Sequence, residues 1–130
     1  MTGTYALISP DGSLQFRDGA AEHMGEDADP HNGAPSGFTI LRPSWGARGL
    51  HGHVGDSSAL ARDVYPPNHV AGRLVAALGG PERYVFGNLT ICGSHIPQGS
   101  EEPEICGLSE AQQRLITAVH TAVSQHIGTP

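Results

Sequence analysis

The clearest strand signal in this 130-residue chain is the run Tyr84-Val85-Phe86-Gly87-Asn88-Leu89-Thr90-Ile91-Cys92. Val85, Leu89 and Ile91 share one face of an extended chain, because successive side chains alternate between faces. The other face also carries aromatic and β-branched residues, so we expect both faces to be at least partly covered. A strand covered on both sides belongs near the centre of a sheet. We therefore predict a sheet built around this segment.

Two amphipathic helices are predicted on either side of this strand in the sequence. The first covers Asn68–Leu78, since Asn68 can cap the free N–H groups and prolines precede it. The second covers Ser109–Ile127, where Ser109 and Gln112 have the spacing of a capping box. Apolar residues recur at helical spacing in both segments. We expect both helices to cover the same face of the sheet.

Weaker strand signals complete the predicted sheet. Tyr5–Ile8 and Leu14–Phe16 alternate between apolar and polar residues, and Pro10-Asp11-Gly12 between them favours a tight turn and hence a hairpin. Phe38–Leu41 and Gly49–Gly55 are the third and fourth strand signals. The predicted fold class is α+β, a small antiparallel or mixed sheet of about four to five strands with two main helices on one face.

The length of 130 residues predicts one domain that spans residues 1–130. Two segments have too few large apolar side chains to bury much surface: an acidic flexible loop over 18–37, with one helical turn near residues 20–24, and a polar loop over 93–107. The first holds five of the thirteen carboxylates in the chain, Asp18, Glu22, Glu26, Asp27 and Asp29. The acidity of the chain is therefore concentrated and not uniform.

The charge balance narrows the classes of partner. All seven cationic residues are arginines, and the formal net charge is −6 with histidine neutral. Phosphate neutralisation normally supplies much of the affinity for nucleic acid, so the charge argues against nucleic acid as the primary ligand. The sequence shows no basic, apolar leader and no run of about 18 apolar residues. We predict a cytoplasmic protein without a membrane partner.

Candidate binding residues lie near the ends of the predicted strands. His51 and His53 are two residues apart and share one face of a strand, where they could supply two imidazoles to a metal or one as a general base. Together with Asn68, Cys92 and His95 they form an alternative hypothesis. In that hypothesis, the protein binds a small molecule or a metal at the end of the sheet.

The sulfur and imidazole groups of Cys92-Gly93-Ser94-His95, with Cys106 further on, are the ligands that would hold a zinc ion. A structural zinc normally takes four protein ligands, so we predict no metal and no cofactor, and name Cys92, His95 and Cys106 as the ligands if one binds. Cys92 and Cys106 could instead form a disulfide around the loop. A reducing cytoplasm favours two free thiols.

No catalytic residue is assigned from the sequence. A Gly-x-Ser-x-Gly elbow is missing, and a lysine-containing phosphate loop is impossible without lysine. The primary prediction is a non-catalytic accessory or interaction protein that acts through a protein partner or as a homodimer. A further alternative is an acidic DNA-mimic inhibitor, which would array its carboxylates along elongated elements.

Several short motifs occur in a familiar order, namely Pro66-Pro67-Asn68-His69-Val70-Ala71, Val85-Phe86-Gly87-Asn88-Leu89-Thr90-Ile91-Cys92-Gly93 and Gly107-Leu108-Ser109-Glu110. This order resembles a family of small domains of unknown function from bacteria, plasmids and phages. The resemblance covers Tyr5–Arg17 and Ala59–Val123. It implies an α+β domain that is often encoded near mobile-element genes, and it implies no activity, ligand or catalytic residue.

Overall fold

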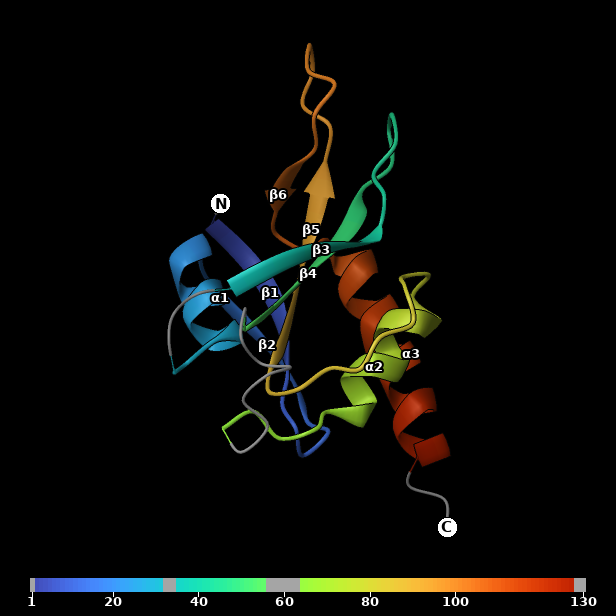
Figure 1. The fold of residues 1–130 in the computed structure, drawn as a ribbon. Coiled ribbons are helices and arrows are strands. Elements are labelled where there is room, and N and C mark those ends of the chain that lie inside the picture. Colours follow the sequence, from blue (N-terminus) through green and yellow to red (C-terminus); the bar gives the residue numbers. More distant parts are fainter. Residues whose placement is uncertain (1, 32–34, 56–63, 128–130) are drawn as a thin grey trace.

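The computed structural model describes residues 2–31, 35–55 and 64–127 (Figure 1). Within these residues, an antiparallel sheet has the strand order β2-β1-β5-β4-β3, and a short β6 also pairs with β5. The strands are β1 (Thr2–Ile8), β2 (Leu14–Ala20), β3 (Pro35–Leu41), β4 (Gly49–Gly55), β5 (Leu89–His95) and β6 (Glu104–Cys106). The predicted α+β class and the predicted β1–β2 hairpin are confirmed.

The central strand of the sheet is β5. On one side it pairs with β4, from Gly49 opposite Ser94 to His53 opposite Thr90. Its other side is shared, because β1 pairs with the first half of β5 and β6 with the second half. The predicted central position is confirmed, but the strand begins at Leu89 and not at Tyr84. Gly87 has a φ of 76° and donates its N–H to the carbonyl of Pro66, which interrupts the extended backbone.

One face of the sheet carries α2 (His69–Ala77) and α3 (Glu110–Ile127), as predicted. Figure 1 shows the two helices side by side. Leu74 and Val75 of α2 are fully buried against the sheet, and α3 contributes Ile116. Both predicted caps are present in the described residues. Asn68 accepts the N–H of Ala71, and Ser109 exchanges hydrogen bonds with Gln112.

The opposite face is covered by α1 (Ala21–Ala28), which corrects the predicted flexible loop over 18–37. The described part of that segment is mostly regular structure, since β2 continues to Ala20 and β3 begins at Pro35. Met24 is the only large apolar side chain of α1, and it is buried against Tyr5 and Cys92. Tertiary contact therefore stabilises a helix that its own apolar pattern is too weak to predict.

Hydrogen bonds attach the acidic end of this segment to the rest of the molecule. The Tyr5 hydroxyl donates to Asp27, which also forms an ion pair with Arg17 at 3.2 Å. The Tyr65 hydroxyl donates to the buried carboxylate of Asp29 at 2.6 Å. Asp18 also accepts the hydroxyl of Thr4 at 2.6 Å, so three of the five carboxylates in the segment are structural acceptors.

The predicted polar loop over 93–107 is also corrected, because β5 extends to His95 and β6 covers Glu104–Cys106. Within this segment, residues 96–103 and Gly107 remain outside the ladder. The hydrogen bonds between β5 and β6 join backbone groups and need no apolar side chains. The polar composition of this segment therefore gave no sign of the hairpin. No helix in the described part of the chain is long and apolar enough to cross a membrane.

Candidate functional site

His51 and His53 lie on the face of β4 that looks toward α1. The register places His51 opposite Cys92 of β5 and His53 opposite Gly37 of β3. Directly opposed residues of an antiparallel pair share a face, so the two imidazoles and the Cys92 thiol lie on the same side of the sheet. The two rings meet edge to face, with 4.9 Å between their centroids.

Burial changes the protonation of both imidazoles. Burial, with a smaller contribution from the charge of His51, lowers the pKa of His53 to about 4. Burial also lowers the pKa of His51. Both rings are therefore neutral at pH 7. Within the described residues, the buried Nδ1 of His53 and the buried Oγ1 of Thr90 on the opposing strand have no hydrogen-bond partner.

The Nε2 atoms of the two rings converge above Gly37. A Cβ atom at Gly37 would lie 2.8 Å from Nε2 of His51 and 3.2 Å from Nε2 of His53. Gly37 itself is exposed on the edge strand β3. The two rings lie so close above Gly37 that a side chain at this position would have to displace them.

The set Cys92, His95 and Cys106 is divided between the two faces of the sheet. Cys106 lies opposite Gly93, and His95 lies two residues further along β5. Both therefore point to the face opposite that of Cys92, because side chains alternate along a strand. The three side chains named in case a metal binds therefore do not lie on one face of the sheet. Among the described residues, no group of three or more His, Cys, Asp or Glu side chains is close enough to hold a metal ion.

Neither cysteine forms a disulfide. Their positions on opposite faces explain why the bond considered from the sequence does not form. Burial raises the pKa of the Cys92 thiol to about 12 and also raises that of Cys106. The thiolate is the reactive form of cysteine, so Cys92 is unreactive at neutral pH.

Asn68, which the sequence suggested as a binding residue, has a structural role in the described residues. Its side-chain carbonyl accepts the N–H of Ala71 at 3.1 Å and so caps α2. Its Nδ2 donates to the carbonyls of Ile8, at 3.0 Å, and Gly87, at 2.8 Å. Both side-chain N–H groups are occupied, and the residue is 1% exposed. Asn68 ties α2 to β1 and to the turn before β5.

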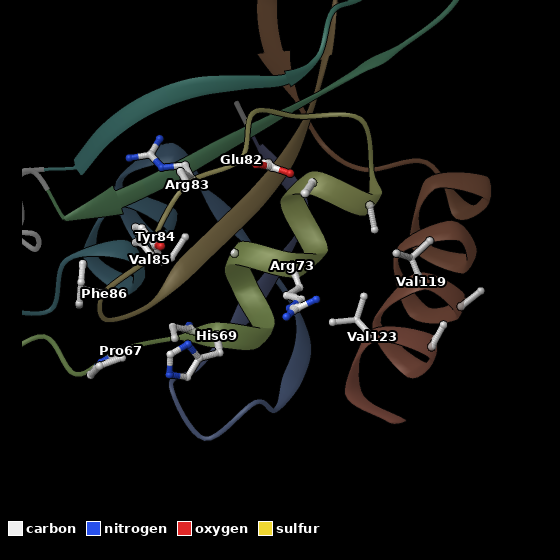
Figure 2. Close-up of a pocket in the computed structure, with 16 residues that line it drawn as sticks. Pro67, His69, Arg73, Glu82, Arg83, Tyr84, Val85, Phe86, Val119 and Val123 are labelled. Atoms are coloured by element: carbon white, nitrogen blue, oxygen red, sulfur yellow. The ribbon is translucent and has the colours of Figure 1, made fainter. Parts of the chain in front are cut away.

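A groove of about 1140 Å³, which the sequence reading missed, lies between α2, α3 and residues 82–86 (Figure 2). We name it the α2–α3 groove. Small residues line it on both helices, Gly72, Ala76 and Ala77 from α2 and Ala118 and Ala122 from α3. Val119 and Val123 extend the apolar lining along α3. The sequence feature that pointed to this groove is the wide apolar stripe of α3. In the described part of the chain only Ile116 of that stripe is fully buried, so other apolar residues of α3 are left to line a groove.

Charged and aromatic side chains lie around the apolar floor of the α2–α3 groove. Figure 2 shows Arg73 extending from α2 toward α3. No carboxylate in the described residues lies within ion-pair distance of its guanidinium. Arg83 instead stacks on Phe38, with 4.2 Å between the guanidinium carbon and the ring centroid. Tyr84 is 87% exposed at the groove.

Comparison of the chain with protein-family models, with curated proteins and with solved structures gives no match. The resemblance to a family of small bacterial, plasmid and phage domains therefore stays a prediction. The fold defines an α+β domain with an apolar groove between its two main helices.

Proposed function

We propose that the protein is a non-catalytic accessory protein of the cytoplasm that binds an acidic, helical segment of a partner protein in the α2–α3 groove. The observation that carries the proposal is the groove, with its apolar floor and an arginine, Arg73, that forms no ion pair within the described residues.

The lining suits an incoming helix. Ala118 and Ala122 are four residues apart on α3 and form one row of small side chains. Gly72 and Ala76 have the same spacing on α2, where Gly72 lies against the carbonyl of Arg83 and Ala76 carries the side chain. Rows at this spacing form the grooves into which the side chains of another helix pack. An amphipathic helix placed between the rows would bury apolar surface that is now partly exposed.

The charge of the groove selects an acidic partner. Two of the seven arginines line it with one carboxylate, Glu82, although the whole chain carries a formal charge of −6. A partner carboxylate beside Arg73 would supply the missing counter-charge. A two-fold dimer through the groove would instead bring Arg73 and Arg83 of a second copy toward the same arginines, because such an interface uses the same patch twice.

Other observations support the non-catalytic and cytoplasmic parts of the proposal. Both thiols are free, which suits a reducing compartment, and burial holds Cys92 in its unreactive form. The DNA-mimic alternative is less well supported. Asp27 and Asp29 accept hydrogen bonds from tyrosines of the same chain, so they do not form an open row of charge.

The proposal is tested with a displayed library of helical peptides selected on the folded protein. We expect selected peptides to carry alanine or leucine on one face and glutamate or aspartate beside it. Binding of a selected peptide, measured by fluorescence anisotropy, should weaken at least about tenfold in Arg73→Glu, which replaces attraction by repulsion in a desolvated contact. Arg42→Glu, an equal charge change outside the groove, is the matched control.

Three outcomes would overturn the proposal. The first is the selection of peptides without acidic residues. The second is equal loss of binding in Arg42→Glu and Arg73→Glu. The third is a dimer in light scattering that Ala122→Arg dissociates, because a second copy of the chain would then occupy the groove. We expect light scattering to show a monomer.

A further inference from the structure

Two imidazole nitrogens converge above a glycine, on the face of the sheet opposite the α2–α3 groove. The position of a Cβ on Gly37 is within 3.2 Å of both Nε2 atoms, those of His51 and His53. Gly37 itself is exposed, on the edge strand β3. A side chain at position 37 would have to displace the two rings.

We infer that His51 and His53 chelate one divalent transition-metal ion through their Nε2 atoms, in the space above Gly37. Imidazole nitrogen is a ligand that suits copper, nickel and zinc. Metal–nitrogen bonds of about 2.0–2.1 Å place such an ion closer to the two rings than the Cβ position is. The site is separate from the α2–α3 groove, and the inference does not rest on the proposed function.

The backbone holds the two ligands in place. β4 pairs with β3 on one side and with β5 on the other, so the strand that carries both histidines is fixed on both edges. Residues two apart on a strand project side by side from the same face. The rings already lie in contact, with centroids 4.9 Å apart. Binding therefore needs little ordering of side chains, which lowers its entropic cost.

The rest of the coordination shell would be water. No third His, Cys, Asp or Glu side chain joins the pair among the described residues. In the same part of the chain, Nδ1 of His53 has no hydrogen-bond partner, so the ring lacks the second contact that usually strengthens a histidine ligand. We therefore expect an exchangeable ion, with copper bound more tightly than nickel or zinc.

The test is calorimetric titration of the metal-free protein with Cu²⁺ and Zn²⁺, combined with electron paramagnetic resonance of the copper form. We expect one ion per chain and nitrogen couplings from two imidazoles. His51→Ala and His53→Ala should each weaken binding at least about tenfold. The chain has eight histidines, so His69→Ala on α2 is the matched control and should bind as the unchanged protein does.

Gly37→Ala tests the position of the ion without removing a ligand. Gly37 is not among the positive-φ glycines, so alanine fits its backbone, and the new Cβ occupies the space between the nitrogens. We expect weaker binding with an unchanged thermal midpoint. Absence of binding to the unchanged protein, or equal binding by the His51→Ala/His53→Ala double variant, would overturn the inference. Full binding by Gly37→Ala would overturn the placement above Gly37 and with it the inference.

Discussion

The two faces of the sheet are built differently. The face under α2 and α3 holds a continuous aliphatic cluster, with Leu74, Leu89 and Ile91 fully buried. The face under α1 holds a small cluster of Tyr5, Met24 and Cys92 beside polar groups. Several polar atoms on this face are buried without a partner in the described residues, namely Nδ1 of His53, Oγ1 of Thr90 and Oγ of Ser94. Because it buries more apolar surface, we expect the face under α2 and α3 to contribute most of the stability. The face under α1 buries polar groups, which do not add to the stability by apolar packing.

The largest expected effect is on the aliphatic face. Leu74→Ala removes a fully buried side chain at the centre of α2 and leaves a cavity. We expect a loss of about 2–5 kcal/mol in the free energy of unfolding, measured by urea denaturation. The exposed Leu115→Ala on α3 is the control, with a much smaller loss. Equal losses of unfolding free energy in the two variants would contradict the proposed difference between the buried Leu74 and the exposed Leu115.

Asn68→Ala should have the second largest effect. The variant loses the cap of α2 and leaves the carbonyls of Ile8 and Gly87 without their donor. We expect a cost of about 1–3 kcal/mol, since a lost cap and unsatisfied buried carbonyls both destabilise. Asn88, which is partly buried and donates to the carbonyl of Asp27, is a matched amide whose replacement by alanine should cost less. The reverse order would contradict the role assigned to Asn68.

On the α1 face, the free energy of unfolding should depend on the protonation of His53. Its pKa is about 4 in the folded protein and about 6.5 when the ring is solvated, so between these values the unfolded chain binds a proton that the folded one does not. Stability should therefore fall as the pH drops from about 6.5 to about 4. We expect a decrease of about 1–2 kcal/mol after solvent screening of this partly exposed ring.

Urea denaturation at a series of pH values measures this decrease. His53→Gln should remove most of the slope, and His69→Gln, at an exposed position on α2, should keep it. If the free energy of unfolding of His53→Gln changed with pH as in the unchanged protein, other groups would titrate in this range. The pH dependence would then not come from His53 on the α1 face.

Gly37→Ala should have the smallest effect on stability. The new methyl group displaces the Nε2 ends of the two imidazoles by a small turn of the rings, while alanine restricts the unfolded chain more than glycine does. These contributions oppose each other, and we expect a change within about 0.5 kcal/mol in urea denaturation. A loss comparable to that of Leu74→Ala would show that the space above Gly37 is tightly packed core, in the same way as the aliphatic face.

Local signals explain which elements were predictable. The cap at Asn68 and the Ser109–Gln112 box act within one turn of helix, so they can be read from neighbouring residues. Helix α1 escaped prediction because Met24 is its only large apolar side chain, and its partners Tyr5 and Cys92 are distant in sequence. Strand β6 escaped because it is three residues long and pairs through its backbone.

Residue types alone indicated the α+β class, the two capped helices and a pair of imidazoles on one strand face, because caps and the alternation of side chains act over a few residues. Strand register separated Cys92 from His95 and Cys106, since a shift of one residue moves a side chain to the other face. The packing of α2 beside α3 opened the groove, and the pairing of β3 with β4 placed Gly37 under two imidazoles. Both sites depend on contacts between residues distant in sequence, and local sequence patterns do not encode those contacts.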